Sequence, residues 1–246
     1  MSPARVLLTE GSSLTSREVV TCLGPCGHDV EVLDPDALCL VRFSRWVAAV
    51  HRCPQAGGDP LGYLARLEEV VADRAIDVVL PTHEQAWLLA TAQPMLAGRV
   101  RVAVADAPAF ARVQSKLAFA SLLDELGLPQ PAWRPVESES DLSGLAFPYW
   151  LKAAFSTAGR GVREVVDART RTEALDALLV PRAGAVMAQQ PARGQYGQVQ
   201  GLFDHGRLVA VHTRMARRRS SSAIRAPSSP ATRPPAASTS PIARSA

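Results

Sequence analysis

The sequence predicts an α/β protein: a domain with a parallel sheet, then a smaller α+β domain, then a low-complexity tail. Over the first 112 residues, short apolar runs that suit buried parallel strands alternate with amphipathic segments. From residue 113 onward the strands follow the pattern of antiparallel pairs, and near residue 215 all regular patterning stops. We therefore expect domains over residues 1–112 and 113–215 and a disordered tail over residues 216–246.

Strand–helix units make up the first domain. RVLLTE (5–10) predicts a buried strand, the polar turn GSSLTS leads into a helix that ends near Leu23, and GHDVEVLD (27–34) predicts the next strand. This order implies a right-handed βαβ unit. The remainder predicts a helix over 61–75, a strand over 76–81, a helix that opens with Thr82 as its N-cap, and a strand over 99–106.

The second domain is expected to mix helices with antiparallel strands. SKLAFASLLDELGL predicts a helix that ends at Gly127. After it the sequence predicts, in order, the strand YWLKAAF, the loop STAGRG, the strand VREVV, a helix over 169–179, the strand AVMAQQ, and a hairpin of QVQGLFD and GRLVAVHTR that turns at residues 204–206.

Composition indicates a cytosolic protein with reduced thiols. With 47% hydrophobic residues the chain can bury a sizeable core, yet it has no apolar run of ~18 residues and no signal-peptide pattern. The four cysteines form neither a paired metal-binding pattern nor a secreted disulfide framework. Cys22 and Cys26 lie four residues apart on a predicted helix. We predict that they are buried in the core of the domain rather than bound to a metal.

The excess of basic charge belongs to the tail. Between residues 216 and 246 there is no acidic residue but there are six of the 27 basic ones (Arg217, Arg218, Arg219, Arg225, Arg233 and Arg244). Without these six, the 23 acidic residues outnumber the basic ones, so the two domains give no indication of nucleic-acid binding. The tail itself has two interpretations, a native disordered segment or the product of out-of-frame translation of GC-rich coding sequence. An arginine-rich arm that binds nucleic acid is a further alternative.

A possible phosphate site lies in LKAAFSTAGRGV, where Lys152 precedes a loop of small residues. Lys152 and Lys116 are the two lysines of the chain. A lysine ammonium is a compact charge that suits phosphate oxygens, and glycine lets backbone N–H groups approach them. The loop supplies such groups, namely Ser156, Thr157, Gly159 and Gly161. It lacks the GK[ST] of a Walker loop, and no GxGxxG follows the first strand, so an ordinary hairpin turn explains the glycines equally well.

The order of segments resembles the ATP-grasp superfamily of ATP-dependent carboxylate–amine ligases. The resemblance spans most of residues 4–214 and rests on VVLPTHE, SKLAF…LGLPQP, YWLKAAFSTAGRGV, AVMAQQPARG and YGQVQGLFDHGRLVAVH. It implies a Rossmann-like pre-ATP-grasp domain followed by part of an ATP-grasp domain. It also implies that Lys116 and Lys152 contact the ATP phosphates, under a mobile flap formed by the glycine loop.

The resemblance also implies an adenine site on the strand AVMAQQ. Gln189 and Gln190 match the family's Gln-Glu pair beside adenine, where a carbonyl of Gln190 and the backbone N–H of Ala192 would meet the base. Tyr196 stands where the family usually has an acid for the ribose hydroxyls, and an ordinary buried strand is the alternative interpretation. Thr82, His83 and Glu84 follow a strand of the first domain and are candidates to face a small carboxylate substrate, although capping and surface polarity explain them equally well.

Mg²⁺ accompanies ATP in this family, held by an acidic residue and a later Glu-x-Asn. Nothing acidic follows Asp204, and the chain contains no asparagine, so the metal ligands are expected to be absent. We therefore expect an ATP-binding protein whose lineage is carboxylate–amine or carboxylate–thiol ligation through an acyl-phosphate. We expect this chain to be catalytically incomplete by itself, and we assign no residue a catalytic role. The alternative is a non-catalytic interaction module that pairs with a homo- or hetero-oligomeric partner through an exposed sheet edge.

Overall fold

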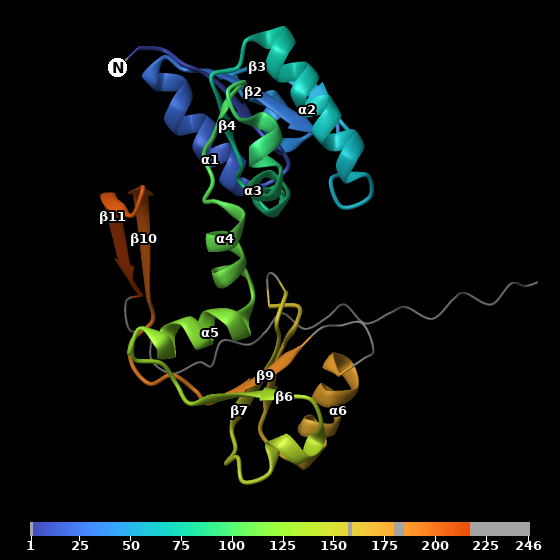
Figure 1. Cartoon of the computed structure of the whole chain (residues 1–246), viewed down its shortest axis with the longest axis vertical. Helices are drawn as coiled ribbons and strands as arrows, with labels where there is room; N and C mark the ends of the chain where they lie inside the picture. Colours follow the sequence, from blue (N-terminus) through green and yellow to red (C-terminus); the bar gives the residue numbers. More distant parts are fainter. Residues whose placement is uncertain (1, 157–158, 180–184, 217–246) are drawn as a thin grey trace, which may run out of the picture.

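The computed structural model describes residues 2–156, 159–179 and 185–216. Its N-terminal domain is an α/β domain built on five parallel strands in the order β3-β2-β1-β4-β5. The strands are β1 (Arg5–Leu8), β2 (Asp29–Asp34), β3 (Val47–Arg52), β4 (Val78–Leu80) and β5 (Arg101–Val102). The helices are α1 (Leu14–Leu23), α2 (Pro60–Arg74) and α3 (Gln85–Leu96). Two short 3₁₀ turns complete the domain, η1 (Gly24–Cys26) and η2 (Leu40–Phe43). Figure 1 shows this domain at the top.

Side-chain alternation along β1 divides the core of this domain into two layers. Leu7 packs with residues of α2 and α3, whereas Val6 and Leu8 pack with Val20 of α1 on the opposite face. Both faces of the sheet are therefore covered, as an all-parallel sheet requires. The predicted α/β class and the βαβ order are confirmed.

Two expectations for this domain were wrong, and one strand was missed. The strand predicted over 99–106 is limited to Arg101–Val102, and β3 was not predicted at all. Cys22 and Cys26 are exposed rather than buried. The buried side of α1 carries Ser16 and Val20, which turns Cys22 to the solvent, and the helix ends before Cys26.

Two consecutive helices join the N-terminal sheet to the second domain. They are α4 (Ala107–Gln114) and α5 (Lys116–Glu125), and the side chains of Asp106 and Ser115 cap them by accepting from backbone N–H groups. The predicted end of α5 is confirmed, since Gly127 follows it with a φ of 63°.

The second domain contains a four-stranded antiparallel sheet in the order β6-β9-β7-β8. Its elements are β6 (Trp133–Val136), the 3₁₀ turn η3 (Glu139–Leu142), β7 (Tyr149–Ala153), β8 (Val162–Val165), α6 (Ala168–Leu178) and β9 (Val186–Gln189). One face of the sheet buries Leu151, Val165 and Ala188 against α6. The opposite face bears Lys152, and α5 contacts β9.

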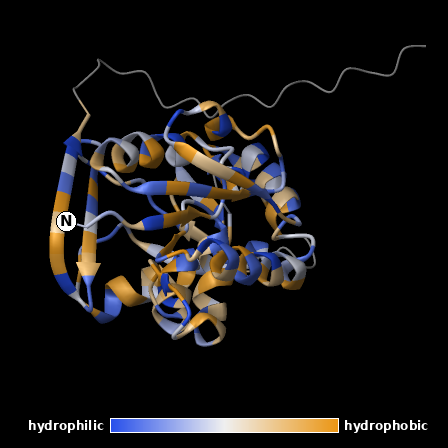
Figure 2. Cartoon of the chain, turned by 90° about the horizontal axis from the view of Figure 1, so that it is seen from above, coloured by the Kyte–Doolittle hydropathy of each residue, from blue (hydrophilic) through white to orange (hydrophobic). Residues whose placement is uncertain are grey.

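A separate hairpin, β10 (Gly197–Asp204) and β11 (Arg207–Met215), forms its own two-stranded sheet. It turns at His205 and Gly206, as predicted, and both have positive φ. Every residue of both strands is exposed, and Figure 1 shows the hairpin standing apart from both sheets. Figure 2 shows hydrophobic residues on both strands, and in β11 they form a run over residues 208–211.

Within the described ranges, no helix has both the length and the apolar character needed to cross a bilayer. The predicted tail lies outside the described residues from residue 217 onward.

Candidate functional site

Lys152 is positioned by the alternation of β7. Tyr149, Leu151 and Ala153 are buried in the core, so Lys152 points to the other face of the sheet. There its ammonium donates a hydrogen bond of 2.6 Å to the amide oxygen of Gln189 on the neighbouring strand β9. The side chain is thus held in place by a neutral acceptor.

Lys116 reaches the same region from the first residue of α5. Its backbone N–H donates to the carbonyl oxygen of Ala154 at 3.0 Å, which fixes the start of the helix to the end of β7. Its ammonium donates to the hydroxyl of Ser156 at 2.9 Å and to the Ser156 carbonyl oxygen at 3.1 Å. Two lysines distant in sequence therefore flank the start of the glycine loop.

The environment of the two lysines disfavours their positive charge. Burial lowers the pKa of Lys116, and burial together with the charge of Lys116 lowers the pKa of Lys152. Among the described residues neither ammonium pairs with a carboxylate, since the recorded partners are neutral oxygens. An anion bound here would supply the missing negative charge to both. We call Lys116 and Lys152 the lysine pair.

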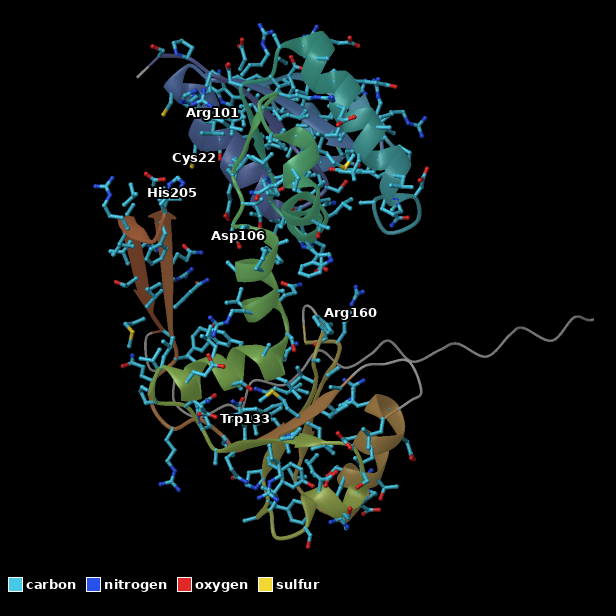
Figure 3. The ribbon with its side chains drawn as sticks, viewed as in Figure 1. Cys22, Arg101, Asp106, Trp133, Arg160 and His205 are labelled. Atoms are coloured by element: carbon cyan, nitrogen blue, oxygen red, sulfur yellow. The ribbon has the colours of Figure 1, made fainter. Side chains whose placement is uncertain are left out.

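The loop beyond β7 passes close to the side chain of Ser156. Gly159 has a φ of 75°, a conformation that L side chains rarely adopt. At Gly161 an added Cβ would lie 2.5 Å from the Cβ of Ser156, so a larger residue would displace the serine that Lys116 contacts. Thr157, also predicted for this site, lies outside the described residues. Arg160 points from the loop toward the N-terminal domain (Figure 3).

The residues predicted to surround adenine lie at and beyond the end of β9. Gln189 serves as the acceptor for Lys152. Gln190 donates through its backbone N–H to Ala132 and through its side-chain amide to Ala146, which leaves its carbonyl oxygens to accept from a base. Ala192 is exposed in the following segment, as is Tyr196, with 70% of its surface accessible.

A cavity of about 480 Å³ joins the loop to the N-terminal domain. His83 and Glu84 line it from the turn after β4, Phe110 and Gln114 from α4, and Phe155 and Ser156 from the loop after β7. Phe110, Gln114 and Phe155 were not predicted, because their part in the site depends on how the two domains meet. We call this space the inter-domain cavity.

Thr82 does not cap α3, in contrast to the prediction. The helix begins at Gln85 after Glu84, and no side chain caps it. The Thr82 hydroxyl lies 2.8 Å from that of Ser16 and donates to Glu10 at 3.4 Å. It therefore joins the strand end to the polar turn after β1.

The described residues do not provide an obvious divalent-metal site. They contain no group of three or more His, Cys, Asp or Glu side chains placed to share an ion, and both lysines bring positive charge to the region. Among the described residues, therefore, no donor set fits Mg²⁺.

Comparison with solved structures places this arrangement in a known fold. No protein-family model and no curated protein matches the sequence. An L-amino acid ligase from Bacillus licheniformis aligns over 86% of this chain and 49% of its own, with a TM-score of 0.66 and 16% identity. N5-carboxyaminoimidazole synthetase from Staphylococcus aureus, complexed with ADP, aligns over 87% of this chain and 55% of its own, with a TM-score of 0.65 and 15% identity.

The biotin carboxylase domain of Hydrogenobacter thermophilus 2-oxoglutarate carboxylase, in complex with MgADP, aligns over 80% of this chain and 47% of its own, with a TM-score of 0.61 and 13% identity. All three are ATP-grasp enzymes, and this chain has their fold over the part that it shares with them. It spans about half the length of the solved structures that it matches.

The lowered pKa values predict how anion binding responds to pH. Above about pH 7.5 a terminal phosphate is fully ionised, so any further change comes from the protein. As the pH rises through the lowered pKa of either lysine, the free protein loses a positive charge that the bound anion favours. Affinity for a phosphate-bearing anion should therefore fall with rising pH before the ordinary lysine value of about 10.4, and binding should take up protons.

Calorimetric titration in two buffers of different ionisation enthalpy measures this proton uptake directly. Affinity that stays constant up to the ordinary lysine pKa, without proton uptake, would contradict the electrostatic coupling of the two lysines.

Proposed function

We propose that this protein binds ATP with its phosphates between the two ammonium groups of the lysine pair. The observation that carries the proposal is the lysine pair itself: two partly buried ammonium groups that repel each other and hydrogen-bond to neutral oxygens. Phosphate oxygens would accept from both, and the glycine loop would cover them. Solved ATP-grasp structures of this fold with bound ADP support the assignment.

The chemistry that we propose for this lineage is carboxylate ligation. A carboxylate oxygen attacks the γ-phosphorus of ATP, and ADP leaves to give an acyl-phosphate. An amine nitrogen then attacks the acyl carbon, a C–N bond forms, the C–O bond to phosphate breaks, and the nitrogen gives up a proton. The name of the Bacillus licheniformis neighbour, an L-amino acid ligase, agrees with this reaction class. The inter-domain cavity, beside Ser156, is where we place the carboxylate.

We also propose that this chain binds ATP without completing the reaction by itself. No acidic residue follows Asp204 and the sequence has no asparagine, so the family's late metal ligands have no counterpart in it. Phosphate release in the presence of ATP and Mg²⁺ tests this statement. Release dependent on the carboxylate substrate, at rates typical of enzymes (about 1 s⁻¹ or faster), would contradict it.

A second candidate function, an interaction module, is favoured by the exposed hairpin. In register, Gly201 faces Val211 and Phe203 faces Leu208, and an added Cβ on Gly201 would meet both Phe203 and Leu208. These residues therefore share one apolar side, which Val199 extends by alternation. A two-stranded sheet with an uncovered apolar side is marginally stable in water, so a partner that covers it would stabilise it.

This candidate predicts self-association or partner binding through the apolar side. Light scattering coupled to size exclusion should show oligomers of the purified chain that dissociate in V199T/V211T. The matched control is Q200T/H212T on the other side of the hairpin, since Gln200 pairs with His212. A wild-type chain that stays monomeric at high concentration would count against self-association.

A further inference from the structure

The lysine pair holds the two side-chain amines of this chain. Of its 27 lysine and arginine residues, only Lys116 and Lys152 are lysines. Both are partly accessible, and the backbone N–H of Lys116 binds the carbonyl oxygen of Ala154, just beyond the strand that carries Lys152. An arginine guanidinium stays protonated in proteins, whereas a lysine that loses its proton becomes a nucleophilic amine. The pair therefore offers an amine chemistry that no other side chain of the sequence provides.

Lys152 has the surroundings of a nucleophilic amine. Its Nζ donates to the amide oxygen of Gln189 at 2.6 Å, and a neutral amine can keep this hydrogen bond while its lone pair stays free. No carboxylate pairs with Lys152 among the described residues, and the remaining residues of the sequence include no Asp or Glu. Burial and the charge of Lys116 both lower the pKa of Lys152. These two conditions activate lysines toward carbonyl carbons.

Lys116 has the surroundings of an anion binder. An ammonium has three N–H donors, and that of Lys116 uses two acceptors on Ser156, the hydroxyl at 2.9 Å and the carbonyl oxygen at 3.1 Å. These bonds leave one donor, and the positive charge, for an anion. Burial lowers the pKa of Lys116, whereas Lys152 is affected by burial and by the neighbouring charge. We therefore expect Lys152 to lose its proton first and Lys116 to stay charged beside it.

A ligand that suits both groups carries a carbonyl carbon and a phosphate. We propose that Lys152 forms an imine with small phosphorylated aldehydes whose phosphate is bound by Lys116. The neutral nitrogen of Lys152 attacks the aldehyde carbon, and a C–N bond forms. The carbonyl oxygen then leaves as water with both protons of the amine, and a C=N double bond remains.

This reaction goes beyond the proposed function and does not depend on it. No oxidant, reductant or nucleotide takes part in imine formation. Water reverses the reaction, so the modification is reversible. While it lasts, it replaces the charge of Lys152 and occupies the lysine pair, which would compete with any other phosphate-bearing ligand there.

The probe for this inference is glyceraldehyde 3-phosphate, incubated with the protein without nucleotide. Sodium cyanoborohydride traps the imine as a stable amine, which peptide mass spectrometry assigns to Lys116 or Lys152. Glyceraldehyde, the same aldehyde without phosphate, is the matched control. We expect the phosphorylated compound to label Lys152 at least about fivefold faster, because its bound phosphate holds the aldehyde beside the amine. Excess glycerol 3-phosphate, which has the phosphate but no carbonyl, should remove this difference.

Variants separate the roles of the two lysines from general reactivity. R163K introduces an amine at an exposed position of β8, which both compounds should label at one low rate. K116R keeps a positive charge at the start of α5 and should retain most of the preference of Lys152 for the phosphorylated compound, whereas K116Q should abolish it.

Four results would overturn the inference. They are preferential labelling of Lys116, equal labelling of Lys152 and of the amine introduced by R163K, equal rates with glyceraldehyde and its phosphate, and an undiminished preference in K116Q.

Discussion

Replacing Lys152 with alanine is expected to weaken ATP binding by about 10- to 100-fold. The variant removes one charge-assisted donor to the phosphates, and such hydrogen bonds contribute about 1.5–3 kcal/mol. It also leaves the Gln189 amide oxygen without its partner at the end of β9. The measurement is an isothermal titration with ATP at fixed salt concentration.

The control for this prediction is Arg163→Ala. Arg163 is exposed on β8 of the same sheet, and its guanidinium donates to the carbonyl oxygens of Arg160 and Val162. Its loss removes one positive charge from the same sheet and should change the ATP affinity less than twofold. Equal weakening by both variants would indicate a general effect of charge and would count against a specific phosphate contact.

Leu151, the residue next to Lys152 on β7, should affect the stability of the fold much more than Lys152 does. Leu151 is fully buried in the core that β7 shares with α6. Leu151→Ala should lower the free energy of unfolding by about 2–5 kcal/mol, because it removes buried methyl groups and leaves a cavity. Lys152→Ala, on the opposite face of the strand, should change it by less than about 1 kcal/mol.

Denaturant unfolding of the two variants measures this difference. Val166→Ala, at a position half exposed just beyond β8, provides the control for loss of apolar surface outside the core. It should shift the free energy of unfolding by no more than about 0.5 kcal/mol. A Leu151→Ala protein as stable as the control would mean that the second domain does not pack as described.

Much of the lysine pair could be predicted from local sequence. Strand alternation in YWLKAAF turns Lys152 away from the core, and Ser115 marks the start of the helix that begins with Lys116. The contact between Lys152 and Gln189 could not be predicted, because it depends on the register between β7 and β9. Register between strands far apart in sequence is set by the whole sheet rather than by either strand.

Other features required the three-dimensional arrangement of the two domains. The polar character of Thr82 predicted a helix cap, but its hydroxyl contacts Ser16 and Glu10 beyond the ends of the adjacent strands β4 and β1 instead. Phe110 and Phe155 carry no sequence signal for a site, since aromatic residues are usual in cores. They face a common cavity because α4 places the domains beside each other.

A crystal structure of this chain with ADP would test phosphate binding by the lysine pair most directly. We expect phosphate oxygens within hydrogen-bond distance of the ammonium groups of both Lys116 and Lys152, with the base at the end of β9 near Gln190. Nucleotide bound elsewhere, or phosphates that contact neither lysine, would contradict this binding mode.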